Sequence, residues 1–191
     1  MLAGTGSDVG KSILAAAFCR ILKQDGYHPA PFKAQNMALN SYATPEGLEI
    51  GRAQAVQAEA AGVPCHTDMN PLLLKPSSEH TSQVVLLGKP IGDRNAYEYF
   101  RKEGREELRK VVNESYNRLA TRYNPIVMEG AGSISEINLR DVDLVNMPMA
   151  KHAGADVFLV ADIDRGGVFA SVYGSILLQT PEERSLIKGI I

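Results

Sequence analysis

The sequence predicts an α/β fold, with a mainly parallel sheet and helices on both of its faces. Two observations lead to this prediction. Short apolar runs without polar alternation, which are typical of strands buried on both faces, occupy 125–128 and 157–161. Stretches with the apolar spacing of amphipathic helices alternate with such runs along the chain. This alternation of strands and helices is the pattern of α/β proteins, whose sheets are mostly parallel.

The first helix is expected directly after a glycine-rich segment, and its apolar side chains recur at a spacing of three or four. These side chains are Ile13, Leu14, Ala17, Phe18, Ile21 and Leu22. Gly26 then provides a typical helix stop. A short strand is expected at 29–33, a polar and irregular segment at 34–50, and an Ala- and Gln-rich helix at 53–61.

The middle of the chain is expected to contain two short strands and one long helix. The strands are expected at 72–74 and 84–87, where apolar runs lie between Pro and Gly residues. A helical pattern extends over 96–123, with Gly104 as a weak point. We interpret its charge run, 101–110, as a solvent-exposed face whose opposite charges pair along the helix.

The last part of the chain continues the alternation. A helix is expected at 144–153, with an interruption at Pro148, and another at 168–178. The segment 187–191 resembles the opening of a further strand. Very few residues precede the glycine-rich segment, where a full buried strand is usual, so we expect a single domain over 1–191 that is part of a longer protein.

Composition excludes several classes of protein. The 191 residues are enough for one domain with a substantial core. A net charge of −2 argues against a dedicated nucleic-acid binder, and no apolar run reaches the roughly 18 residues that a membrane span needs. Cys19 and Cys65 are too few for a disulfide framework, and 1–6 lacks the features of a signal peptide. We therefore expect a cytoplasmic protein without nucleic-acid or membrane partners.

The glycine-rich segment has the features of a phosphate-binding loop. It consists of Gly4, Thr5, Gly6, Ser7, Asp8, Val9, Gly10, Lys11 and Ser12. Glycines let successive backbone N–H groups point at one anion, and the helix N-terminus adds partial positive charge. Lys11 would reach the β- and γ-phosphates of ATP or GTP, and Ser12 would ligate Mg²⁺. The usual pattern is altered, because Thr5 takes the place of the first glycine and Gly4 stands one position earlier.

Acidic side chains follow two of the expected buried strands. Ligands of open α/β sheets bind beyond the carboxyl ends of the strands, so we expect Glu129 to meet the metal on the phosphates. Asp162, Asp164 and Arg165 follow the other strand, and we assign them to the metal, to catalysis and to the substrate, respectively. The alternative for these three residues is an ion pair among themselves.

Two polar segments are candidates for binding a substrate. Lys33 follows the second expected strand and would neutralise charge on a transferred phosphoryl group. The amides that come after it suit carboxylate or amide groups of a substrate, unless the segment is only a polar surface loop; they belong to Gln35, Asn36 and Asn40. The stretch 135–143 could close over a substrate with Asp141, or Asp141 or Asp143 could instead cap the helix that follows.

Several motifs together resemble the N-terminal domain of the cobyric acid synthase family, and the resemblance covers essentially the whole chain. These motifs are GTGSDVGKS (4–12), FKAQNMALNS (32–41), GRAQA (51–55), MNPLLLKP (69–76), EGAGS (129–133) and DIDRGGVFA (162–170). The combination is highly specific. The same domain is similar to dethiobiotin synthetase, which shares the displaced first glycine of the loop.

The resemblance implies a glutamine-dependent amidotransferase that uses ATP and Mg²⁺. Its corrinoid substrate would be adenosylcobyrinic acid a,c-diamide, whose four remaining peripheral carboxylates are amidated to give adenosylcobyric acid. In such a protein Lys11 and Ser12 serve ATP and Mg²⁺, Glu129 is a metal ligand, and Lys33 contacts phosphate and substrate. The family also carries a C-terminal glutaminase domain with a Cys-His-Glu triad, which these 191 residues do not supply.

Three other possibilities stay open from the sequence. A carboxylating ligase of the dethiobiotin synthetase type would use the same loop, although the amides at 35–36 and the run 164–167 favour the corrinoid. A partitioning-type ATPase switch usually carries a second lysine early in the loop, and 4–7 contains none. The chain as given could also bind nucleotide without catalysing a reaction.

Overall fold

A parallel sheet forms the centre of the chain, for which the computed structural model describes residues 1–77, 81–95 and 102–191. Its strands are β1 (Leu2–Gly4), β2 (Ala30–Phe32), β9 (Ile126–Met128), β10 (Val157–Val160) and β11 (Ile187–Ile190). Parallel pairing links β11 to β10, β10 to β1, and β9 to β2. A parallel bridge between Leu2 and Glu129 joins the two groups, which gives the order β11-β10-β1-β9-β2.

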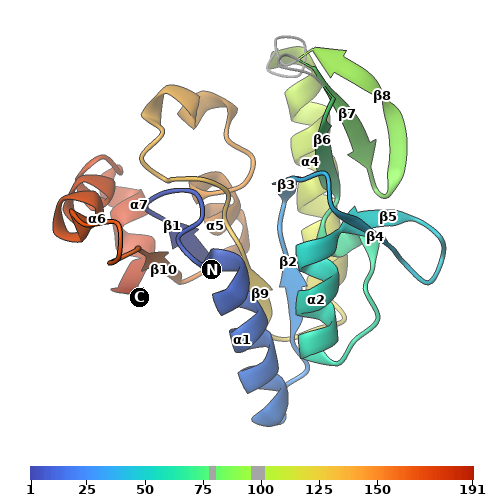
Figure 1. Ribbon diagram of the computed structural model, residues 1–191, viewed down its shortest axis with the longest axis horizontal. Coiled ribbons are helices and arrows are strands. Elements are labelled where there is room, and N and C mark those ends of the chain that lie inside the picture. The colour runs from blue at the N-terminus through green and yellow to red at the C-terminus, as the bar shows by residue number, and fades with distance from the viewer. Residues whose placement is uncertain (78–80, 96–101) are drawn as a thin grey trace.

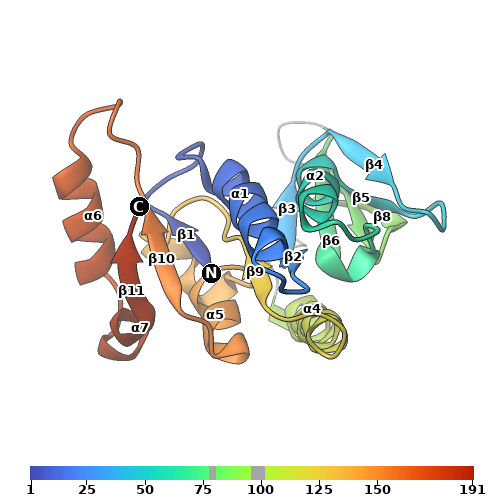
Figure 2. The same cartoon turned by 90° about the horizontal axis from the view of Figure 1, so that it is seen from below.

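Helices lie on both faces of this sheet (Figure 2). They are α1 (Lys11–Gln24), α2 (Arg52–Ala61), α4 (Lys102–Ala120), α5 (Met147–Ala153), α6 (Val168–Leu177) and α7 (Pro181–Leu186). Helices α1 and α2 pack against each other on one face, whereas α4 and α5 lie on the other and α7 packs against β11. The predicted α/β fold, with its parallel sheet covered on both faces, is confirmed.

A second group of strands extends the molecule beyond β2 (Figure 1). It contains β3 (Gln35–Met37), β6 (Leu72–Pro76), β7 (Thr81–Leu86) and β8 (Lys89–Asn95). β3 pairs with β6 in parallel, whereas β6, β7 and β8 are antiparallel. A hairpin of β4 (Ser41–Ala43) and β5 (Glu49–Gly51) and two short 3-10 helices, η1 (Thr67–Met69) and η2 (Ile137–Val142), complete the described elements.

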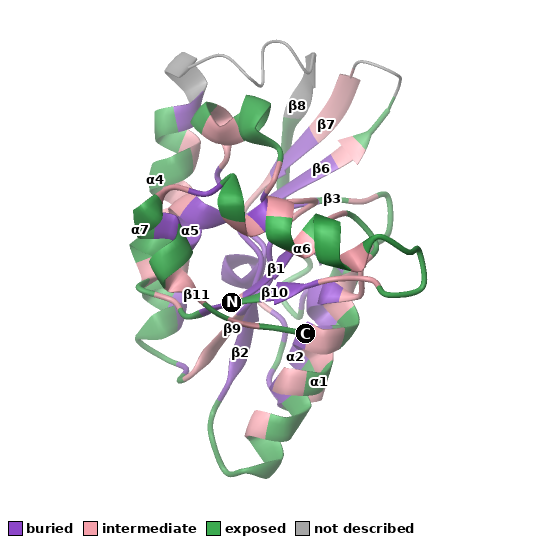
Figure 3. Cartoon of the chain, turned by 90° about the vertical axis from the view of Figure 1, so that its left-hand side faces the viewer, coloured by how far each residue is buried: buried purple, intermediate pink, exposed green. Residues whose placement is uncertain are grey.

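The main core lies between the strands and the helices on either side. Phe32, Leu72 and Met128 from the strands belong to it, together with Leu119 from α4 and Met149 from α5. In Figure 3 the strands are largely buried, whereas the outward sides of the helices are exposed. Helices α4 and α5 therefore present an apolar side to the sheet, as the spacing of apolar residues predicts for a helix that covers a core.

The structure corrects the expectation of an irregular segment at 34–50, where β3, β4 and β5 lie. β3 is stabilised by β6, which pairs Gln35 with Leu72, and a turn at 44–47 closes the β4–β5 hairpin. Pairing with a neighbouring strand, distant in the sequence for β3 and local for β4 and β5, decides that these polar residues form strands, although they show no apolar alternation.

Two helices also differ from expectation. Pro148 does not interrupt α5, because it lies in the first turn, where a missing N–H group costs little. α4 runs from Lys102 to Ala120, and the expected part at 96–101 lies outside the described residues. The interpretation of 101–110 as a solvent-exposed face is wrong for Arg105, which is only 6% exposed.

Both cysteines are free and buried. Burial raises the pKa of the Cys19 thiol to about 12, so this thiol stays protonated, as expected of a residue within the core. No helix in the described part of the chain is long and apolar enough to span a membrane.

Candidate active site

The glycine-rich segment connects β1 to α1 and leaves the N-terminus of α1 open to a ligand. Gly10 is the N-cap residue and has a left-handed backbone, with φ of 96°. As a glycine it has no side chain with which to cap the first N–H groups of α1. Open N–H groups at a helix start, together with the helix dipole, form a binding site for an anion such as phosphate.

The Lys11 ammonium group is held over the loop by backbone oxygens. Its Nζ atom donates to the carbonyl oxygens of Gly6, at 2.7 Å, and Gly132, at 2.9 Å. Burial, and then repulsion from Lys33, lowers the pKa of Lys11. The lysine therefore carries a poorly solvated charge whose partners are neutral, and an anion at this position would stabilise it.

The displaced glycine of the loop has a steric cause. A Cβ atom at Gly4 would lie 2.6 Å from Lys11 Nζ, 2.8 Å from the Gly6 carbonyl oxygen and 2.9 Å from that of Gly132. Two of these three atoms belong to the backbone, which cannot move aside easily. Gly4 is thus required for the close approach of the Lys11 ammonium group to the loop.

Glu129 lies where the sequence predicts it, beside the start of α1. Its Oε1 atom accepts a hydrogen bond from Ser12 Oγ at 2.6 Å and one from Lys33 Nζ at 2.7 Å. The parallel register pairs Phe32 of β2 with Met128 of β9, so Lys33 and Glu129 emerge side by side from the same end of the sheet. Glu129 is only 2% exposed, and its charge is balanced by Lys33.

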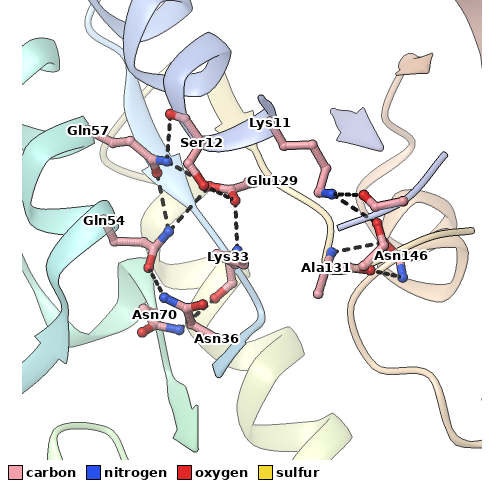
Figure 4. Close-up of polar contacts among 12 residues, drawn as sticks. Lys11, Ser12, Lys33, Asn36, Gln54, Gln57, Asn70, Glu129, Ala131 and Asn146 are labelled. Atoms are coloured by element: carbon pink, nitrogen blue, oxygen red, sulfur yellow. Dashed lines mark hydrogen bonds and ion pairs between the residues drawn. The ribbon is translucent and has the colours of Figure 1, made fainter. Parts of the chain in front are cut away.

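Two glutamines that the sequence analysis did not identify bind the other oxygen of this carboxylate (Figure 4). Gln57 Nε2 donates to Glu129 Oε2 at 2.7 Å, and Gln54 Nε2 donates to it at 3.4 Å. Both glutamines lie on α2 and are almost completely buried. The signal available in the sequence was a pair of amides one turn apart on a helix that otherwise presents small residues to the sheet.

Asn36, a predicted substrate residue, connects this network to the cavity. Its Nδ2 atom donates to Gln54 Oε1 at 3.0 Å. A Cβ atom at Gly51 would lie 2.7 Å from both of these atoms and 2.9 Å from Asn70 Oδ1. Gly51 therefore allows the buried amides to pack together.

The loop after Glu129 is fixed by Asn146, another residue that the sequence analysis missed. The Asn146 side chain accepts from the Ala131 N–H at 3.1 Å and donates to the Ala131 carbonyl oxygen at 2.9 Å. Asp143 in turn accepts from the backbone N–H groups of Val145 and Asn146, which precede α5. The N-cap residue of α5 is Asn146, so the alternative that Asp143 caps this helix is wrong. Burial raises the pKa of Asp143, although these N–H groups oppose the shift.

A cavity of about 800 Å³ connects these groups. The predicted site residues among its lining are Ser7, Asp8, Gly10, Lys11, Ser12, Lys33, Gln35, Asn36 and Glu129. Arg105 and Arg140 also line it, and neither was predicted. The volume beside Lys11 is large enough for a ligand the size of a nucleotide.

Other predicted site residues do not belong to this lining. Asp162 and Arg165 form an ion pair at 2.9 Å, and the Asp164 N–H donates to Asp162 Oδ1 at 2.9 Å. The ion pair between Asp162 and Arg165 is the one that the alternative interpretation describes, whereas Asp164 contacts Asp162 through its backbone N–H group. Asn40 and Asp141 are exposed outside the cavity lining. The roles assigned to these five residues stay predictions.

The donor set fits a magnesium ion bound together with phosphates. Ser12 and Glu129 offer hydroxyl and carboxylate oxygens, which are the ligands that Mg²⁺ prefers. Within residues 1–77, 81–95 and 102–191, no three His, Cys, Asp or Glu side chains gather as a metal-binding cluster. A cation here would therefore depend on oxygens of the bound nucleotide, which is typical of Mg²⁺ in enzymes that act on ATP.

Comparisons with known proteins show the family to which the chain belongs. The family model described as the CobQ/CobB/MinD/ParA nucleotide binding domain matches residues 1–191. Proteins named cobyric acid synthase are 86% identical in Bacteroides fragilis, 85% in Phocaeicola vulgatus and 66% in Parabacteroides distasonis, each over 100% of the chain. The chain spans only 38–39% of the length of these curated relatives.

Proposed function

Because the chain belongs to the family of CobQ/CobB/MinD/ParA nucleotide-binding domains, we propose that it is the ATP-dependent synthetase part of a corrinoid amidoligase. Its fold is P-loop NTPase-like, with the phosphate loop between β1 and α1. The observation that carries the proposal is the meeting of Ser12, Lys33 and Glu129 at the start of α1. The relatives named cobyric acid synthase supply the class of reaction and of substrate.

In this proposal the nucleotide is ATP, and the segment 4–12 holds its phosphates. Ser12 and Glu129 would hold Mg²⁺, which when bound would neutralise part of the phosphate charge. Asp162 stays a further candidate ligand beyond the cavity lining. Lys11 is held by neutral carbonyl oxygens and Lys33 by the Glu129 carboxylate in this structure, so each would exchange those partners for phosphate oxygens.

The proposed chemistry activates a carboxylate of the substrate. A carboxylate oxygen attacks the γ-phosphorus of ATP, the bond to the β-phosphate oxygen breaks, and an acyl phosphate and ADP form. Ammonia then attacks the acyl carbon and loses a proton, inorganic phosphate leaves, and an amide remains. The contribution of the chain is mainly to position the reactants and to neutralise charge through Lys11 and Lys33, with Asp164 as a further predicted catalytic residue.

The part of the cavity that the nucleotide leaves free would receive the substrate. The cavity lining includes Gln35, Asn36, Arg105 and Arg140, and amide and guanidinium groups bind carboxylates well. A corrinoid with several peripheral carboxylates fits such a surface. Arg165, Asn40 and Asp141 stay predicted substrate residues outside this lining.

We further propose that ammonia comes from a glutaminase domain of the longer protein. The relatives are much longer than the 191 residues of this chain, which leaves room for such a domain. We expect the protein to act in the cytoplasm.

The test is to supply the protein with ATP, Mg²⁺, ammonium salt and adenosylcobyrinic acid a,c-diamide. We expect ADP release that depends on the corrinoid, together with amide products. ADP release at the same rate without the corrinoid would contradict the proposed function. Stimulation by the substrate of dethiobiotin synthetase instead would favour the carboxylating ligase.

A further inference from the structure

The two carboxylate oxygens of Glu129 face different surroundings (Figure 4). Oε1 accepts from Ser12 and Lys33, both of which line the cavity. Oε2 accepts from Gln57 and Gln54, which are 1% and 0% exposed and do not belong to the cavity lining. One oxygen is thus directed toward the ligand space, and the other is enclosed by protein.

The orientation of the Gln57 amide is fixed by its neighbours. Its Nε2 atom donates to Glu129 Oε2 at 2.7 Å and to the Ser12 carbonyl oxygen at 3.3 Å, and an ionised carboxylate and a carbonyl oxygen can only accept. Its Oε1 atom accepts from Gln54 Nε2 at 3.5 Å, and Gln54 Oε1 accepts from Asn36. A flipped Gln57 amide would place oxygen against oxygen, so its donors stay on Glu129 and Ser12.

The partners of the two oxygens differ in how readily they can be exchanged. Lys33 has a flexible side chain beside the cavity, and Ser12 can turn its hydroxyl group toward a bound cation. Gln54 and Gln57 are almost completely buried on α2, which packs against α1, and Gln54 lies so near the Gly51 backbone that a Cβ atom there would be 2.7 Å from its Oε1 atom. Arrival of a cation can therefore release Oε1, whereas Oε2 keeps its donors.

We propose that Gln57, supported by Gln54, is a positioning residue that makes Glu129 a one-oxygen ligand and thereby favours Mg²⁺ over Ca²⁺. This inference rests on the proposed function, because it takes Glu129 as the metal ligand. Mg²⁺ is small and requires near-octahedral geometry, whereas Ca²⁺ accepts both oxygens of one carboxylate and a more flexible shell. A carboxylate whose second oxygen is engaged by buried amides suits the smaller ion.

The experiment measures the affinity of the whole protein for a non-hydrolysable ATP analogue in Mg²⁺ and in Ca²⁺, by calorimetry. Gln57→Met keeps the length of the side chain and removes both donors. Val56→Gln, at an exposed position next to it on α2, is the matched control. We expect the preference for Mg²⁺ over Ca²⁺ to fall about tenfold in Gln57→Met, a size typical of residues that orient metal ligands, and to persist in Val56→Gln.

A second variant keeps the proposal testable if Gln57→Met does not fold. Gln54→Met removes the longer contact, at 3.4 Å, so a smaller fall in the same ratio is expected. An unchanged ratio in whichever of these variants folds and binds nucleotide would overturn the inference, even if its melting temperature fell. Nucleotide binding by the unmodified protein that is independent of any divalent cation would instead contradict the proposed function.

Discussion

The Ser12 hydroxyl group donates a 2.6 Å hydrogen bond to Glu129 Oε1, although 117 positions separate the two residues in the sequence. Ser12 belongs to the first turn of α1, and Glu129 directly follows β9. Lys33 Nζ lies 2.7 Å from the same oxygen. A hydroxyl, a carboxylate and an ammonium group therefore meet at the helix start where a phosphate is expected, and the following predictions test this arrangement.

Removing the charge of Glu129 is expected to destabilise the protein and to abolish its activity. Glu129→Gln leaves the Lys33 ammonium group nearly buried without its partner, which typically costs about 3–5 kcal/mol. Adding Lys33→Met removes the unpaired charge and should restore most of the stability, but not the synthetase activity. Urea unfolding and ADP release measure the two effects. A double variant no more stable than Glu129→Gln would argue against the ion pair.

Replacing Gly4 by alanine is expected to disturb the loop. The new Cβ atom would lie 2.8 and 2.9 Å from two backbone oxygens, so the free energy of unfolding should fall by about 1–3 kcal/mol, as in other overpacked sites. Nucleotide affinity should fall as well, because the Lys11 ammonium group must move. Gly6→Ala is the stability control, since its Cβ atom meets only Val9 at 3.7 Å. Equal stability of the two variants would refute the steric account of Gly4.

Nucleotide binding is expected to take up a proton at alkaline pH. The pKa of Lys11 is lowered, so the free protein loses this proton at a lower pH than an ordinary lysine does. The ordinary lysine pKa is about 10.4. A bound phosphate favours the ammonium form and raises the pKa again, so binding between the two pKa values adds a proton, and affinity declines as pH rises. Calorimetry over a series of alkaline pH values below the ordinary lysine pKa of about 10.4, in two buffers of different ionisation enthalpy, measures the uptake. Proton uptake that persists in Lys11→Met would show that a group other than Lys11 takes up the proton, which would contradict this prediction.

Asn146 is expected to matter for both stability and nucleotide binding. Asn146→Ala leaves the N–H and carbonyl groups of Ala131 without their partner, at a cost of about 1–3 kcal/mol for buried polar groups. The loop that carries the Gly132 carbonyl oxygen, a partner of Lys11, should loosen, which would raise KM for ATP. Thermal unfolding and steady-state kinetics check these expectations. Unaltered KM and stability would show that the loop holds its shape without Asn146.

The parts of the site that sequence predicted are those fixed by local patterns and strand ends. Lys11 and Ser12 follow from the phosphate loop, and Lys33 and Glu129 each follow a short apolar strand. Because parallel strands end at one edge of the sheet, these residues meet. Whether a segment forms a helix or a strand could also be predicted for most elements, because short apolar runs and helical spacing are local signals.

The parts that sequence missed depend on distant contacts. For Gln54 and Gln57 the sequence offers only the spacing of two amides on one helix, and their role as donors to Glu129 follows from the packing of α2 against the sheet. Arg105 sits in a charge run that is typical of an exposed helix, and only the packing of α4 turns it toward the cavity. β3 likewise becomes a strand through its pairing with β6. No periodicity along the chain carries this information.

Binding of the ATP triphosphate at the start of α1 is tested by the affinity of Lys11→Ala for an ATP analogue in Mg²⁺. Loss of a charged hydrogen bond to phosphate should weaken binding about 10- to 100-fold relative to the unmodified protein. Circular dichroism checks that the variant is still folded. A folded Lys11→Ala protein that binds the analogue as tightly as the unmodified one would contradict the account.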